Sequence, residues 1–326
     1  MSHGTDTAEI AAMHNGSGLV TTHDRELAGM QRILRATALA GVVIVLLVTT
    51  SSAWLRLRGL GLGCDDWPRC YAQAEAQSAA AEPSIARILH RLSATLAGAA
   101  VLGIALIAAA RARAHRRELM LAAAMLVLLL GLAWLGRATP GATVPAIAIG
   151  NVLGGLLLAA LLFWLALDPQ PRPARGPAWL PVASALALLL AFAQIGLGVL
   201  TSASHSGLAC TGFPGCATEG FPGAWAAAEL DPWRTAAASA SIHMAHRVAT
   251  LASAGAVALV AWALRGPTPL LASALLALLA IQIGLGVAVV VGNLPLAIAV
   301  LHNVGAALLL LALVAAHHSS LRLGKP

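Results

Sequence analysis

The sequence contains few charged residues. Charged side chains make up only 10% of its 326 residues, whereas hydrophobic residues make up 59%. A globular chain usually carries about 25% charged residues, and a soluble protein of this length could not cover its surface with so few. The composition therefore excludes a soluble globular protein, and its apolar character equally excludes low-complexity disorder. Most of the surface must face lipid.

Lysine is almost absent. Lys325 is the only one, although the formal net charge is +7. The arginines are scattered through short segments between apolar runs and do not gather in one basic stretch. This distribution argues against nucleic acid as a partner and indicates orientation in a membrane.

Eight apolar runs are long enough to cross a bilayer. They lie at about 36–55, 84–110, 119–136, 143–167, 177–201, 237–264, 269–291 and 294–316. We therefore expect an all-α integral membrane protein with eight transmembrane helices. A polar tail of about 30 residues precedes the first run, which is too long for a cleaved signal peptide, so we interpret the first helix as retained.

The basic residues predict the orientation of the helices. Twelve lie before the first run, after every even-numbered run or at the C-terminus: Arg25, Arg32, Arg35, Arg111, Arg113, Arg116, Arg117, Arg172, Arg175, Arg265, Arg322 and Lys325. Five lie in the opposite loops: Arg56, Arg58, Arg69, Arg137 and Arg234. Because positive charge favours the cytoplasmic side, we expect both termini in the cytoplasm.

All thirteen acidic residues can be placed outside the apolar runs. This weakens the hypothesis of a proton-coupled transporter, which needs carboxylates within the membrane. The ionisable residues inside the runs are histidines and arginines: Arg87, His90, Arg91, His243, His246, Arg247 and His302. Ionisable groups at this depth are costly and are candidates for function.

Three of these histidines share a depth. His90, His246 and His302 each lie roughly 9–14 Å inside the outer end of their run at helical rise. Two imidazoles at equal depth on facing helices suit axial coordination of one haem, so we predict that His246 and His302 bind a haem. The alternative is that each is a hydrogen-bonded core histidine. If a haem is bound, Arg91 and Arg247 would pair with its propionates; otherwise they would snorkel to the surface. His243 would support His246 or make an unrelated polar contact.

Four cysteines occur as two pairs in the long outer loops. Cys64 and Cys70 are six residues apart, as are Cys210 and Cys216. One disulfide per loop is our first interpretation for an oxidising compartment, and free thiols or a metal knuckle are the alternatives.

The chain contains an internal repeat. The same step of 146 residues leads from Cys64 to Cys210 and from Cys70 to Cys216, and similar steps relate His90 to His246 and Asn151 to His302. The motif QIGLGV occurs at 194–199 and again at 282–287. We therefore expect two pseudo-twofold-related four-helix bundles made by duplication. The predicted division is a cytoplasmic tail (1–32), an N-terminal half (33–167), a Pro-rich linker (168–177), a C-terminal half (178–316) and a second tail (317–326).

The motifs together resemble the haem A synthase family, membrane enzymes that convert haem O to haem A for cytochrome oxidase assembly. The similarity is clearest in SAWLRLRGLGLGCDDWPRC (52–70), in QIGLGVLTSASHSGLACTGFPGC (194–216), in HR at 90–91 and 246–247, and in HN at 302–303. It implies a b-type haem on His246 and His302, a haem O substrate site at His90, and oxidation of a methyl to a formyl group with oxygen from water. It also implies the bacterial inner membrane as location.

Two positions depart from the family pattern. The fourth ligand histidine should fall at Asn151, and a glutamate is usual where this chain has Arg87. Asparagine is a poorer iron ligand than imidazole, so His90 would bind iron alone or opposite water or another side chain. Glu82, Asp65 and Asp66 are the remaining candidates for a general base in the outer loop.

Three functions follow from these features. The first is a haem A synthase that retains activity with a changed N-terminal site. The second is a non-catalytic b-type haem protein, either an electron carrier or a delivery factor for oxidase assembly, and the third is a transporter. Haem O synthase, oxidase assembly proteins, membrane lipid and a second copy of the chain are the expected partners.

Overall fold

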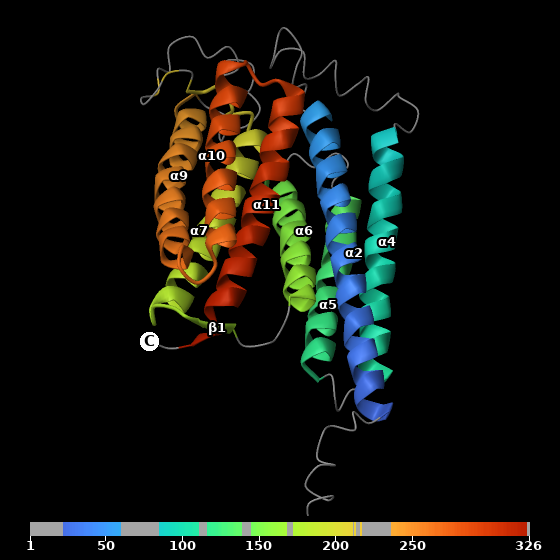
Figure 1. The fold of residues 1–326 in the computed structure, drawn as a ribbon. Coiled ribbons are helices and arrows are strands. Elements are labelled where there is room, and N and C mark those ends of the chain that lie inside the picture. The colour runs from blue at the N-terminus through green and yellow to red at the C-terminus, as the bar shows by residue number, and fades with distance from the viewer. Residues whose placement is uncertain are drawn as a thin grey trace, which may run out of the picture.

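The computed structural model describes residues 22–59, 85–110, 116–138, 145–167, 172–210, 212, 216 and 236–324. Within these ranges eight helices are long and apolar enough to cross a membrane, as the apolar runs predict. They are α2 (Thr22–Gly59), α4 (Ile85–Ala110), α5 (Arg116–Ala138), α6 (Pro145–Ala166), α7 (Leu180–Ala203), α9 (Ala236–Leu264), α10 (Pro269–Val291) and α11 (Leu296–Ser320). Figure 1 shows them running roughly alongside one another.

Apolar side chains face outward along these helices. Leu251, Leu130 and Leu270 are exposed by 74%, 72% and 87%. Water would not tolerate so many large apolar side chains on one surface, whereas hydrocarbon does. The protein is therefore a multi-pass membrane protein.

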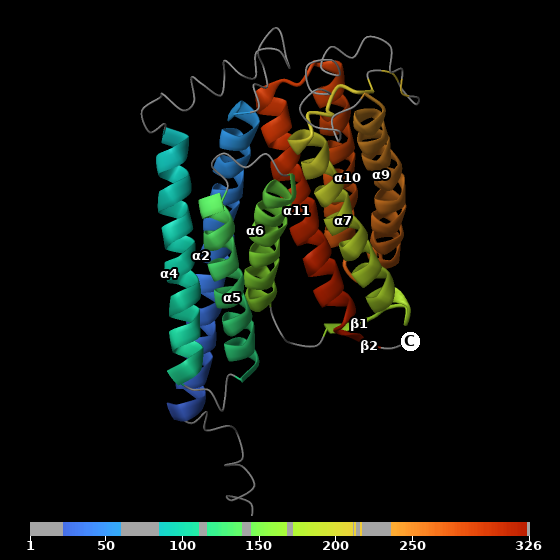
Figure 2. The ribbon, with the colours of Figure 1, turned by 180° about the vertical axis from the view of Figure 1, so that it is seen from behind.

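The helices pack in two neighbouring groups. In the first, α2 contacts α4 and α6, and α5 also contacts α4 and α6; in the second, α7 contacts α9 and α11, and α10 contacts the same two. The two groups are joined by contacts of α11 with α2 and α6, and by contacts of α6 with α7. The view from behind in Figure 2 shows α4 and α9 at opposite edges.

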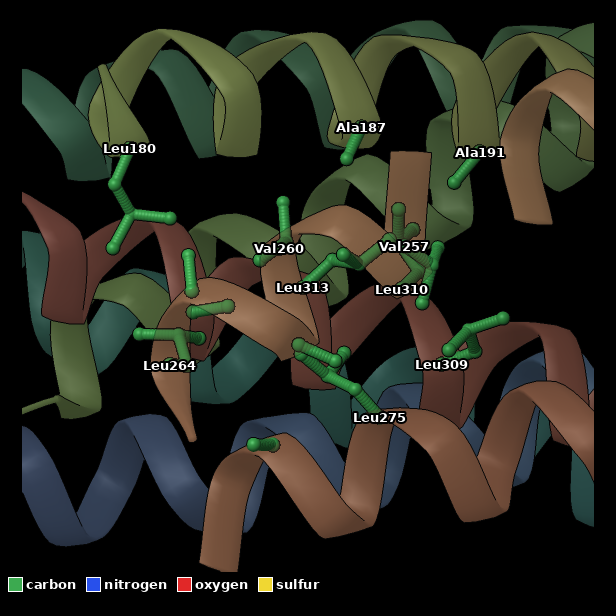
Figure 3. Close-up of a cluster of buried hydrophobic side chains, with 14 of the residues drawn as sticks. Leu180, Ala187, Ala191, Val257, Val260, Leu264, Leu275, Leu309, Leu310 and Leu313 are labelled. Atoms are coloured by element: carbon green, nitrogen blue, oxygen red, sulfur yellow. The ribbon is translucent and has the colours of Figure 1, made fainter. Parts of the chain in front are cut away.

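Each group has its own apolar core. Figure 3 shows the core of the second group, in which Leu180, Val260, Leu264, Leu275 and Leu313 converge from all four of its helices. The other core is formed by side chains such as Val45, Ile104, Met125 and Leu162, with Leu311 of α11 added to them. Because Leu311 belongs to the second group, its burial ties the groups together.

Proline marks the starts of four helices. Pro145 and Pro269 are the first residues of α6 and α10, Pro181 follows the first residue of α7, and Pro295 directly precedes α11. Proline lacks the N–H that a first turn would leave unbonded, and its fixed φ suits the start of a helix. The short turn 292–295 thereby returns the chain into α11 and sets the level of His302.

The boundaries differ from the predicted ones at both ends of the chain. Helix α2 starts at Thr22, although its apolar run begins near residue 36, and it also includes Arg56, which we had placed in a loop. Helix α11 continues to Ser320. A hydropathy pattern detects only the residues that face lipid. Residues of high helix propensity continue the helix beyond that apolar run into the polar zone. Residues 172–175 of the predicted linker form β1 (Arg172–Arg175), which pairs in parallel with β2 (Leu323–Gly324).

Candidate functional site

Helices α9 and α11 present His246 and His302 to the middle of the second group. Both helices contact α7 and α10 but barely contact each other, so they occupy diagonal positions in a four-helix arrangement. Both imidazoles are half-buried and lie within electrostatic range of each other. The two side chains predicted as a pair are thus on opposite sides of one bundle interior.

The imidazole of His246 lies against α7. The side-chain amide nitrogen of Gln194 is 3.1 Å from its Nδ1, and the same nitrogen donates to the carbonyl oxygen of His246 at 2.9 Å and to Thr250 Oγ1 at 2.6 Å. A Cβ on Gly198 would lie 3.0 Å from the imidazole Cε1. The missing side chain at Gly198 therefore leaves the space that the ring occupies.

His302 has the same surroundings on α10. The amide nitrogen of Gln282 lies 3.3 Å from its Nε2, and a Cβ on Gly286 would lie 3.1 Å from its Cε1. Gln282 and Gly286 are four residues apart, as are Gln194 and Gly198, because both pairs belong to a copy of QIGLGV. One face of each motif therefore holds one imidazole.

One imidazole nitrogen at this site lacks a hydrogen-bond partner among the described residues. His302 Nδ1 is buried and has no hydrogen-bond partner in the described part of the chain, and the same is true of the amide oxygens of Gln194 and Gln282. Buried polar atoms are normally paired, so unpaired ones suggest a missing ligand or water. The described residues contain no cluster of three or more metal-ligating side chains, whereas a haem iron needs only two axial imidazoles.

His90 occupies the matching place in the first group. Its helix α4 contacts α2 and α5 and does not pack on α6, which carries Asn151. His90 Nδ1 lies 3.3 Å from the carbonyl oxygen of Val48, an atom that only accepts, so Nδ1 carries the proton. The lone pair is then on Nε2, the state in which imidazole binds a metal. Asn151 and Arg87 are half-buried.

A disulfide joins Cys210 and Cys216 in the segment after α7, which confirms one of the two predicted pairs. Cys64 and Cys70 lie outside the described residues, as do Asp65, Asp66 and Glu82.

Two residues of α9 hold this disulfide loop. Arg247 donates to the carbonyl oxygen of Gly212 at 2.6 Å and to that of Cys210, and His243 Nδ1 accepts from the Cys210 N–H at 3.3 Å. His243 and Arg247 are four residues apart and so share a face of α9. Arg247 is therefore engaged with the loop backbone, a partner that the sequence did not indicate, while Arg91 is exposed.

Two further histidines lie at the end of α11. His318 is buried and its ring meets Trp164 edge-on, with centroids 4.9 Å apart. His317 Nδ1 lies 2.9 Å from Ser184 Oγ. Packing of α11 against α6 and α7 covers both rings. They lie about 24 Å along α11 from His302, so they belong to a separate, structural cluster.

Several contacting residues escaped the sequence reasoning. Gln194 and Gln282 were visible only as parts of a repeated motif whose glycines had been noticed, and the spacing of four between Gln and Gly was the available signal. Arg56 and Asn303 stood in segments noticed for the family resemblance, but their contact could not be predicted because it joins helices far apart in the sequence.

Comparison with known proteins identifies the family of the chain. The family model COX15-CtaA, described as cytochrome oxidase assembly protein, matches residues 35–314. A heme A synthase from Shewanella oneidensis is 33% identical over 306 residues, which cover 84% of this chain and 92% of that protein.

Proposed function

The chain belongs to the COX15-CtaA family of cytochrome oxidase assembly proteins, and on this premise we propose that it is a haem A synthase. It is then an oxidoreductase that converts the methyl group of haem O to the formyl group of haem A. The observation that carries the proposal is the pair of imidazoles on diagonal helices, each seated against a glycine, in a chain of this family.

We propose that His246 and His302 hold a b-type haem in the C-terminal half. Three observations support the fit: both donors are imidazoles, the helices that carry them do not close on each other, and His302 Nδ1 is buried without a partner among the described residues. A bound haem of this kind would supply electron transfer away from the substrate. The chain itself fixes the rings through Gln194 and Gln282.

We further propose that the N-terminal half receives haem O at His90. The contact of Nδ1 with Val48 leaves Nε2 as the donor atom, and Asn151 belongs to α6, the helix diagonal to α4 in the same group. An amide opposite an imidazole leaves a weakly held or exchangeable axial position, which suits a substrate that must leave as product. Arg91 and Asn151 would contact the substrate's polar edge and iron side.

The division into two pseudo-twofold-related halves, 33–167 and 178–316, is part of the same proposal. The separate helix contacts and apolar cores of the two groups support it. The arginine distribution supports an inner-membrane location with both termini in the cytoplasm. Haem O synthase and oxidase assembly proteins are the partners expected to deliver substrate and receive product, and self-association stays a prediction.

The decisive experiment is to express the full chain in cells that make haem O but lack haem A synthase and to analyse the extracted haems. We expect haem A with the wild-type chain and none with His90→Ala. His302→Ala should abolish the bis-histidine spectrum of the purified protein. His317→Gln, which removes a histidine from the inner end of the same helix, is the matched control and should keep that spectrum. Unconverted haem O together with a normal bis-histidine spectrum would instead indicate a non-catalytic haem carrier.

A further inference from the structure

Arg56 joins the two helix groups at the outer end of the molecule. It lies near the end of α2 and donates from one terminal nitrogen to Ser202 Oγ on α7 at 2.5 Å, and from the other to Asn303 Oδ1 on α11 at 3.1 Å. These hydrogen bonds bring a guanidinium of the first group into the second.

No acidic side chain of the described helices lies at the guanidinium of Arg56. Ser202 and Asn303 are both uncharged, and Arg56 Nε is buried with no hydrogen-bond partner in the residues that the structure describes. The acidic residues in the described helices lie in the first two turns of α2 and in the first turn of α5, at the opposite end. An arginine remains charged in proteins, and a buried charge without a counter-charge is costly. The position therefore favours an anion.

Arg56 also lies close to the imidazole pair. Its partner Ser202 is four residues beyond Gly198, which places it on the same face of α7 and about 6 Å further out. Its other partner, Asn303, directly follows His302. The guanidinium is thus about one helical turn outward of the level of His246, between α7 and α11.

We propose that Arg56 binds a carboxylate of the tetrapyrrole held by His246 and His302, an inference that rests on the proposed function. Haem is an apolar macrocycle with propionate groups at one edge, and this edge turns toward the polar end of a membrane site. A guanidinium pairs with a carboxylate through parallel hydrogen bonds. The arginines expected for this role are placed differently, because Arg247 donates to loop carbonyls and Arg91 is exposed.

The internal repeat strengthens the assignment. Arg56 and Ser202 are separated by 146 residues, the step that relates the two cysteine pairs. Two positions related by a twofold axis touch each other only close to that axis. Arg56 therefore belongs by sequence to the N-terminal half while its charge serves the C-terminal site, so that tetrapyrrole binding there also fastens the two halves together.

The test compares haem with its neutral ester. The full chain in detergent is stripped of haem and titrated with haem b or with haem b dimethyl ester, whose propionates carry no charge. We expect Arg56→Met to bind haem b about ten- to a hundredfold more weakly than wild type, the loss typical of a hydrogen bond to a charged group. The same variant should bind the dimethyl ester as wild type does. Arg56→Lys should recover part of the affinity for haem b.

Two controls separate this role from others. Arg58→Met removes an exposed arginine from the same helix end and should leave both affinities unchanged. Equal weakening for haem b and for its ester in Arg56→Met would show that Arg56 only joins the helices, and the proposal would be wrong. It would also be wrong if Asp65→Asn with Asp66→Asn reproduced the loss for both compounds, since a loop carboxylate would then be the partner. Wild type that binds neither compound would contradict the proposed function itself.

Discussion

At the scale of single residues, the candidate site depends on side chains that are absent. Gly198 and Gly286 each face an imidazole at a distance where a Cβ would force a shift. The other glycine of the second motif, Gly284, has no atom within 4 Å of the Cβ position. Each copy of QIGLGV therefore has one glycine, Gly198 or Gly286, that leaves room for an imidazole ring. In the second copy the other glycine, Gly284, has no such role.

This difference gives a paired prediction. Gly286→Ala should displace the His302 ring, because the new Cβ would lie 3.1 Å from its Cε1, and overpacking of this kind costs about 1–3 kcal/mol. We expect lower haem content and an altered visible spectrum of the purified protein.

Gly284→Ala is the matched control, with the same change two residues away in the same helix. It should leave haem content and spectrum as in wild type. If both variants behaved alike, the role assigned to Gly286 would be wrong.

At the scale of elements, helix α9 carries two functions on adjacent faces. His246 points to the bundle interior, while His243 and Arg247 hold the Cys210–Cys216 loop. Because these residues share one helix, the disulfide loop is connected through α9 to His246, a proposed haem ligand.

The loop contacts predict the accessibility of the disulfide. Arg247→Met removes hydrogen bonds from a charged donor to the carbonyls of Cys210 and Gly212, which are worth about 1.5–3 kcal/mol each. The loop should open more often, so dithiothreitol should reduce the Cys210–Cys216 bond several times faster, as followed by alkylation of the released thiols in a variant that keeps only this cysteine pair.

Arg265→Met provides the comparison for this experiment. Arg265 directly follows the C-terminal end of the same helix, where its guanidinium lies 4.7 Å from the centre of the Trp262 ring. Its loss should not alter the rate of reduction, and a similar acceleration in both variants would point to general destabilisation.

At the scale of the whole molecule, helices α2 and α11 start and end, respectively, on the same side. The start of α2 and the C-terminal end are at the same side in Figure 1, and β2 near the C-terminus pairs with β1 between the two helix groups. An even number of spans requires this arrangement. Half-buried Trp164 and the buried Ser184 and His318 form a polar and aromatic cluster at that side.

Orientation can be tested directly. Because basic residues favour the cytoplasm, green fluorescent protein fused after Pro326 should fluoresce, and alkaline phosphatase inserted within 139–144 should be active outside the inner membrane. The reciprocal fusions should both be silent. Activity of phosphatase at the C-terminus would reverse the predicted orientation.

Much of the fold could be predicted from the sequence because lipid imposes a long apolar run on every span. The eight runs correspond to eight helices, and the Cys210–Cys216 disulfide followed from spacing in an outer loop. Helix ends were less accessible, as the early start of α2 shows, since the polar residues before residue 36 continue a helix without facing lipid. The burial of His318 was not predictable for a related reason: its position near the end of a run says nothing of the helices that cover it.

The sequence by itself determined the membrane architecture, the family and the depth of His90, His246 and His302, because these depend on local composition and on helical rise. Only the tertiary structure decided the neighbours of each polar group. Arg56 reads as a loop charge until α2, α7 and α11 are placed together, and Arg247 reads as a propionate ligand until the disulfide loop is seen on α9. Inside a bilayer no water satisfies such groups, so their partners are set by the rotation and packing of helices, which a linear pattern does not contain.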